Sequence, residues 1–179
     1  MSFDIAFEHT VGLEGGYTDN PADAGGPTKF GITEAVARAN GYQGDMRELP
    51  LETAKAIYRT KYWNALNLPP IDARTQEVAE QLFDIAVNDG PFIAAEFLQT
   101  ALNAFNRRGV DYGDVSVDGE IGASTLKAFK AFLDRRGADG IRVLGRALNV
   151  QKGARYLALA KARAADEDFE FGWFLNRVA

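Results

Sequence analysis

Apolar residues at helical spacing fill almost every long stretch of this chain, and no run of five or more residues alternates convincingly between apolar and polar side chains. This pattern is typical of a mainly α-helical protein. It predicts helices over residues 3–13, 34–40, 51–63, 76–88, 91–105, 123–136 and 140–164. The capping signals are Ser2, Thr33 and Thr75 at N-cap positions, Pro50 at a first helical position, and glycines at 15–16 and 41 after helix ends.

One turn-rich segment, residues 17–32, interrupts the helical pattern. It contains Asp19-Asn20-Pro21, Gly25-Gly26-Pro27 and Gly31, which are residues that favour turns. We therefore expect a small turn or hairpin near 17–32, and no other part of the chain is expected to form a sheet.

Gly90-Pro91 separates two long helical segments, and no flexible or low-complexity linker lies beside it. We expect two closely packed lobes, residues 1–90 and 91–179, with a loop over 106–122 inside the second.

Cysteine is absent and there is a single histidine. Disulfides, thiolate metal sites, thiol nucleophiles and histidine-rich metal sites are therefore excluded, and no cofactor or metal is implied. Catalysis would have to use carboxylates, hydroxyls, lysine or tyrosine. Among these, paired carboxylates are the usual choice for hydrolysing glycosidic bonds.

Charge is distributed unevenly along a chain of formal net charge -5. The first 90 residues are strongly acidic, which does not indicate a nucleic-acid partner. Six cations and no acid lie within 140–163. Four of them, Arg142, Arg146, Lys152 and Arg163, share one helix face and predict weak contact with an anionic envelope. The alternative is an ordinary solvated helix surface.

Glu14 is placed where a predicted helix meets Gly15-Gly16, and the polar residues Asp19, Asp23 and Thr28 follow on the segment that folds back. A general acid needs a rigid, partly apolar setting that raises its pKa, and a second group needs a wetter position across from it. A helix end beside a hairpin can supply both settings.

The run Glu14-Gly15-Gly16-Tyr17, followed by Asp-Asn-Pro, by Asp23 to Thr28 and by Gly31-Ile32-Thr33, resembles glycoside hydrolase family 108. This is a family of phage and bacterial N-acetylmuramidases with a lysozyme-like helical fold. Residues 83–88 resemble its second signature, and Tyr62-Trp63 resemble its cleft-side aromatics. The resemblance implies an endolysin-type muramidase, with Glu14 as the catalytic acid that cleaves the β-1,4 bond between N-acetylmuramic acid and N-acetylglucosamine.

In the second half, Leu98 to Asn103 and Val117 to Leu126 resemble the predicted peptidoglycan-binding region that accompanies this family. The resemblance implies bacterial peptidoglycan as the partner of a protein that we expect to be a monomer.

Several roles remain open at this stage. Asp23, with Thr28, is a candidate for placing water or stabilising charge, but Asp23 could equally hold an Asx-turn and Thr28 a strand hydrogen bond. Phage-type lysozymes also place this threonine one residue later. Candidate substrate contacts are Tyr17, Tyr62, Trp63 and Asn88, although such aromatics are more often core residues. Asp84, on the same helix face as Asn88, is expected in a structural polar network.

Two rival functions also fit the sequence. A lytic transglycosylase would use one glutamate on the same bond and need no second carboxylate. A non-catalytic wall-binding or secretion accessory would tolerate the loss of Glu14. The chain shows no signal peptide or apolar span. We therefore expect cytoplasmic synthesis and action on the wall after the membrane has been permeabilised.

Overall fold

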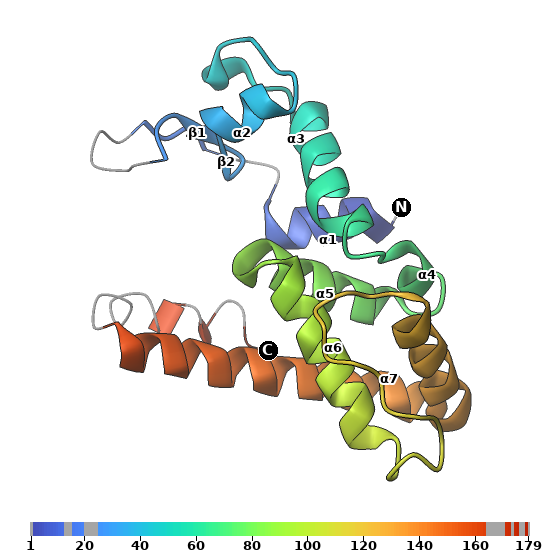
Figure 1. Ribbon diagram of the computed structural model, residues 1–179. Helices are drawn as coiled ribbons and strands as arrows, with labels where there is room; N and C mark the ends of the chain where they lie inside the picture. Colours follow the sequence, from blue (N-terminus) through green and yellow to red (C-terminus); the bar gives the residue numbers. More distant parts are fainter. Residues whose placement is uncertain are drawn as a thin grey trace.

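The structure, a computed structural model, describes residues 2–12, 16–19, 25–163, 171–172, 174–175 and 178. It is mainly helical with one small antiparallel hairpin, as expected (Figure 1). The elements are α1 (Ser2–Thr10), β1 (Thr28–Lys29), β2 (Ile32–Thr33), α2 (Glu34–Ala39), a 3-10 turn (Met46–Glu48), α3 (Leu51–Tyr58), a π-helical turn (Arg59–Asn64), α4 (Pro69–Asp72), α5 (Gln76–Asp89), α6 (Pro91–Phe105) and α7 (Ala123–Ala162). None of the helices within these described ranges is both long and apolar enough to cross a membrane.

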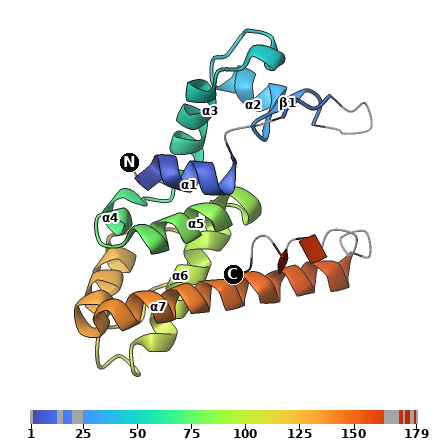
Figure 2. The same cartoon turned by 180° about the vertical axis from the view of Figure 1, so that it is seen from behind.

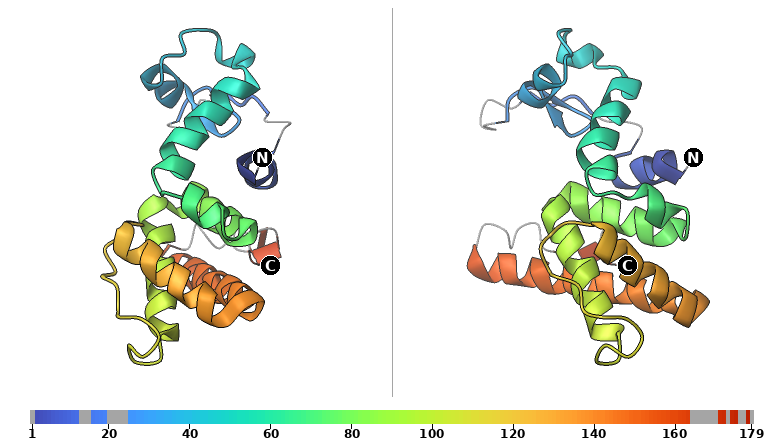
Figure 3. Two further views of the ribbon diagram at one scale, coloured as in Figure 1. Left: turned by 90° about the vertical axis from the view of Figure 1, so that its right-hand side faces the viewer. Right: turned by 45° about the vertical axis from the view of Figure 1, so that its right-hand side comes forward.

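Helix α5 lies at the centre of the molecule and connects its two parts. It packs against α1 and α4 on one side and against α6 and α7 on the other. Figure 3 shows the hairpin, α2 and α3 beyond α1, and α6 and α7 on the opposite side of α5. In Figures 1 and 2 the hairpin and the C-terminal half of α7 project from the same side of the α1–α5 pair. Because α5 packs on both parts, the division at residue 90 stays a prediction.

The core of the first part is a cluster of aromatic rings around Phe83, which is fully buried. Phe3 and Trp63 meet its ring edge-on, at centroid distances of 5.7 and 5.8 Å. The apolar positions predicted on this helix are all buried, namely Val78, Ala79, Leu82, Phe83, Ile85 and Ala86. Each large side chain removed from water stabilises the fold by about 1.5–3 kcal/mol, so α5 anchors both parts of the molecule.

The predicted helix boundaries match the observed ones best around α5. Gly90, with φ 98°, ends α5 and precedes α6, whose first residue is Pro91. The Thr33 side chain accepts a hydrogen bond from the Val36 amide at 3.4 Å, as expected of an N-cap. Thr75 occupies the N-cap of α5 without a side-chain cap bond.

Two other capping predictions were wrong by one residue. Pro50 is the N-cap of α3 rather than its first residue, and Ser2 is already helical. Such one-residue differences are common at helix ends, where the last turns lack a full set of backbone bonds.

Helix α1 ends at Thr10, three residues earlier than predicted. Gly12 has φ 81°, and its amide donates to the Glu8 carbonyl at 3.1 Å. A glycine in the left-handed region just past the last turn is a common helix stop, because it closes the final carbonyls without a side-chain clash. The helix-ending signal is therefore Gly12, upstream of Gly15-Gly16.

The hairpin is joined to the core through its turn. Phe30 and Gly31 both have positive φ, as a two-residue type I′ turn requires. The Tyr58 hydroxyl donates to the Phe30 carbonyl at 3.0 Å. A Cβ on Gly31 would lie 2.7 Å from that hydroxyl oxygen, so the close approach depends on glycine. Thr18 adds a third segment by bridging to Thr28.

Helix α7 bends at Gly137, where φ is 55° and ψ is -141°. The sequence predicts separate helices over 123–136 and 140–164, and the break between them is confirmed. Gly140 packs close to the Phe132 ring, which a Cβ would approach to 3.3 Å. The two segments of α7 therefore meet tightly after the change of direction.

Candidate functional site

The predicted acid Glu14 and its candidate companion Asp23 lie outside the described residues. Two described segments flank Glu14 in the sequence. On one side α1 ends at Thr10, and on the other Thr18 exchanges backbone hydrogen bonds of 2.8 Å with Thr28 in both directions. The roles of Glu14 and Asp23 stay predictions.

Thr28 lies at the start of β1 and is half-buried. Its hydroxyl donates to the Gly26 carbonyl at 2.9 Å. The hydroxyl proton is therefore used within the turn, while the oxygen lone pairs can still accept a hydrogen bond. This hydrogen bond fits the structural role that was the alternative for Thr28. A role in placing water stays a prediction.

Tyr17 lies beside the hairpin with its hydroxyl donating to the Asp19 carboxylate at 3.1 Å. The Arg47 guanidinium lies 5.4 Å from the centroid of its ring. Partial burial and the bond to Asp19 raise the pKa of Tyr17. The tyrosine therefore stays protonated, and both its ring and its hydroxyl oxygen can contact a substrate.

A polar pocket of about 320 Å³ adjoins Tyr17 and includes an acid that the sequence analysis passed over. Glu34, the first residue of α2, pairs with Arg38 at 2.6 Å. The Glu34 carboxylate therefore accepts a hydrogen bond from an arginine on its own helix. An acid in the first turn of a helix is common for stability alone, which is why its position gave no signal.

Tyr62 and Trp63 have different surroundings. Tyr62 is half-buried, packs on Tyr58 at 5.4 Å, and has its pKa raised by burial. Trp63 is only 5% exposed and meets Phe3 and Phe83 edge-on. The prediction that Trp63 stacks on a sugar ring is therefore corrected, because its ring belongs to the core. It lies in the π-helical turn, an irregularity that the regular helix predicted over 51–63 did not include.

Residues 83–88, which resemble the second signature of the family, place the polar residues Asp84 and Asn88 on α5. The Asn88 amide donates to Asp84 Oδ1 at 3.0 Å and to the Asp84 carbonyl at 2.9 Å. The other carboxylate oxygen of Asp84 accepts from Lys152 Nζ at 3.0 Å, and Lys152 is only 4% exposed. The polar network expected at Asp84 is thus present, and its cation comes from α7. Asn88 is exposed and remains a candidate substrate contact.

The predicted four-cation face of residues 140–164 is not present as expected. Lys152 points into the protein, so it cannot meet a polyanion. Arg142 pairs with Asp139 at 2.8 Å, and Arg155 pairs with the buried carboxylate of Asp89 at 2.7 Å. Lys152, from the predicted face, and Arg155, from outside it, therefore connect α7 to α5.

Comparison with known proteins gives two contiguous family matches. The glycosyl hydrolase 108 profile matches residues 7–90, and the profile of a predicted peptidoglycan domain matches residues 93–178. The solved structure of Brucella abortus SagA is 30% identical, with a TM-score of 0.64, covering 96% of this chain and 87% of that one. The chain belongs to the glycosyl hydrolase 108 family. It is a glycoside hydrolase, and peptidoglycan is its partner. The search of curated proteins gave no match.

In this glycosyl hydrolase 108 protein, the peptidoglycan domain is organised by Gln99 of α6, which is fully buried. Its amide nitrogen donates to Asp118 Oδ1 at 2.7 Å and to the Glu120 carbonyl at 2.9 Å. Its amide oxygen accepts from the Asp118 and Gly119 amides, both at 3.1 Å. The Asp118-Gly119 motif therefore has a structural explanation as a loop that Gln99 fastens to α6.

Proposed function

We propose that this glycoside hydrolase is an endolysin-type N-acetylmuramidase that cleaves the β-1,4 bond between N-acetylmuramic acid and N-acetylglucosamine, with Glu14 as general acid. The observation that carries the proposal is the position of Glu14-Gly15-Gly16-Tyr17 inside the segment that matches glycosyl hydrolase 108. This run joins the end of α1 to the edge of the hairpin, where Thr18 pairs with Thr28.

In this mechanism Glu14 transfers its proton to the glycosidic oxygen as the bond to the anomeric carbon of N-acetylmuramic acid breaks. Water adds at that carbon and loses a proton, which gives a reducing N-acetylmuramic acid end. Asp23, with Thr28, is assigned to placing the water or stabilising the positive charge of the transition state. Tyr17, Tyr62 and Asn88 are assigned to contacts with the glycan.

Glu14→Gln tests the assignment, because glutamine keeps the shape of the side chain and has no acidic proton. Loss of general acid catalysis costs about 10²–10⁴-fold in rate. We expect that loss in the clearing of purified sacculi, with binding to sacculi and the melting temperature unchanged. Glu8→Gln on the exposed face of α1 is the matched control and should keep full activity. Retention of more than about a tenth of wild-type activity by Glu14→Gln would exclude the acid role.

The expected route to the wall and the expected monomeric state stay predictions. Expression in a bacterial host should be tolerated until a pore-former is added, and lysis should then follow promptly. Sedimentation velocity of the purified protein should give one species at the mass of a single chain.

A further inference from the structure

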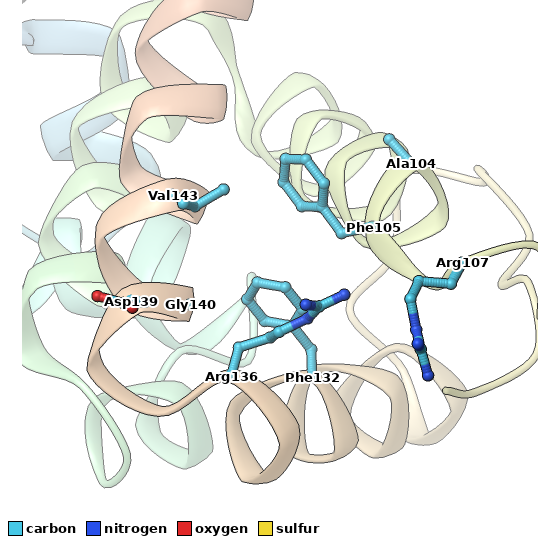
Figure 4. A pocket seen from close by; sticks show the side chains of 8 residues that line it. All are labelled: Ala104, Phe105, Arg107, Phe132, Arg136, Asp139, Gly140 and Val143. Carbon is cyan, nitrogen blue, oxygen red and sulfur yellow. The ribbon is translucent and has the colours of Figure 1, made fainter. Parts of the chain in front are cut away.

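Two adjoining hollows between α6 and α7 form one groove on the peptidoglycan domain. Their volumes are about 340 and 420 Å³, and they share Ala104, Phe105 and Val143. Figure 4 shows the first hollow, where Phe105 and Val143 point toward one another, Arg136 lies near the bend of α7 and Arg107 lies by the C-terminal end of α6. The second hollow continues along α7 as far as Gln151.

The walls of this groove are apolar, although they are open to solvent. Val143 is 39% exposed and Val150 is 70% exposed, both on α7. Phe105 stacks on Phe132, with centroids 5.9 Å apart. Scattered apolar residues on a surface are ordinary, but apolar residues that line a continuous groove mark a binding surface.

Positive charge lies at the end of the groove nearest the bend. Asp111 contacts Arg107 at 2.6 Å, Arg136 at 3.4 Å and Arg135 at 3.7 Å, and its carboxylate is only 6% exposed. Three guanidiniums around one carboxylate leave an excess of positive charge there, and Asp139, the acid that lines this hollow, is paired with Arg142. Further along, the exposed Arg146 has no ion-pair partner among the described residues.

We propose that this groove binds the stem peptide of peptidoglycan, which deepens the proposed function and rests on peptidoglycan being the substrate. Stem peptides are rich in alanine methyl groups and carry free carboxylates. The methyl groups would pack on Val143 and Val150, and the carboxylates would pair with Arg146 and with the arginines at the bend.

The shape and chemistry of the groove favour peptide over glycan. Sugar rings bind exposed tyrosine or tryptophan faces together with many hydrogen-bonding groups, and neither hollow is lined by tyrosine or tryptophan. From Gly140 to Gln151, α7 rises about 16 Å at 1.5 Å per residue. An extended peptide of about five residues covers that length at 3.3 Å per residue, which suits a short stem peptide.

The test measures binding of the full chain to two probes, an N-acetylated stem pentapeptide and peptide-free glycan strands, by calorimetry at low salt. Val150→Glu should weaken peptide binding by about tenfold because it replaces an apolar contact with a charge, and Arg146→Glu should do the same because it replaces a cation that pairs with a carboxylate by a negative charge. The matched controls are Ile5→Glu, on an exposed isoleucine of α1, and Lys127→Glu, on an exposed cation of α7. Both should bind the peptide within about twofold of wild type, since neither lines the groove.

Three results would overturn the proposal. Unchanged peptide affinity in both groove variants would show that the peptide binds elsewhere. Glycan-strand binding that is lost in both variants would assign the groove to glycan, and a dimer that only the groove variants break would assign it to a second copy. Glu14→Gln should bind the pentapeptide normally. A wrong muramidase assignment would therefore show in the products of wall digestion, whereas a wrong groove assignment would show in the peptide-binding measurements.

Discussion

The ion pair between Lys152 and Asp84 joins the peptidoglycan domain to the glycosyl hydrolase lobe, and its removal has a calculable effect. Lys152→Met keeps the length of the aliphatic stem and removes the ammonium group. The lysine side chain is 5% exposed and the Asp84 side chain 24% exposed, with 3.0 Å between nitrogen and oxygen. The variant leaves a largely buried carboxylate that keeps, among the described residues, only the Asn88 amide as a side-chain donor.

Removing one partner of a fully buried pair costs about 3–5 kcal/mol. The partial exposure of Asp84 and its bond to Asn88 place this case at the lower end, near 3 kcal/mol of unfolding free energy. For a chain of this size each kcal/mol lowers the melting temperature by about 2–4 °C. We therefore expect a fall of about 9 °C, measured by calorimetry or circular dichroism near neutral pH.

Lys130→Met is the matched control, because Lys130 pairs with Asp134 on an exposed surface and is 64% exposed. An exposed pair contributes about 0–1 kcal/mol, so the melting temperature should change little. Adding Asp84→Leu to Lys152→Met should recover part of the loss, since it removes the unpaired charge. Equal melting temperatures for the Lys152 and Lys130 variants would refute the view that this pair holds the two parts together.

Three further predictions concern Asp23, Gln99 and Asp111. Asp23→Asn should cut hydrolysis of soluble glycan sharply without lowering the melting temperature; a lower melting temperature with normal specific activity would instead make Asp23 a turn residue. Gln99→Leu should destabilise the protein by about 1–3 kcal/mol, because the buried Thr125 hydroxyl and the Asp118 and Gly119 amides lose their hydrogen bonds to Gln99; a stability within error of wild type would contradict this. The hydrogen bond from Arg107, aided by Arg136 and Arg135, lowers the pKa of Asp111 below 3.8. Its contribution to stability is therefore complete above that value and lost as the pH falls through the lowered pKa, so Asp111→Asn should flatten the decline in stability below pH 3.8.

Much of the helical framework follows from local sequence signals. Helices α5 and α6 begin and end within one residue of their predicted bounds, because Gly90-Pro91 is a strong stop and start signal. The bend of α7 follows from the glycine at its centre. The hairpin is likewise predictable, since the turn residues over 17–32 interrupt the helical pattern between two predicted helices.

The contacts between distant segments could not be predicted in the same way. Lys152 pairs with a carboxylate on another helix, and no local pattern specifies that partner. Its burial did leave a signal, because Leu148, Lys152 and Tyr156 follow at four-residue spacing along the buried side of α7. Charge counting along the sequence overlooked this spacing, and the predicted cationic face was wrong for that reason.

Tertiary packing also determines which of the candidate aromatic residues are buried. Tyr62 and Trp63 are adjacent in sequence, yet one is half-buried and the other lies in the core, because successive residues of a helical turn face different directions. The candidate acid Glu14 was found from its motif alone. The groove on α6 and α7 had no sequence motif, because residues far apart in the chain line it.

The most direct test of the central claim is mass spectrometry of the muropeptides that the enzyme releases from purified peptidoglycan. An N-acetylmuramidase adds water at the anomeric carbon, so every released fragment should end in a reducing N-acetylmuramic acid, and Glu14→Gln should release almost none. Fragments that end in 1,6-anhydro-N-acetylmuramic acid would instead show attack by the muramic 6-hydroxyl and identify a lytic transglycosylase. Reducing N-acetylglucosamine ends would show that a different bond is cut, and either result would contradict the proposed function.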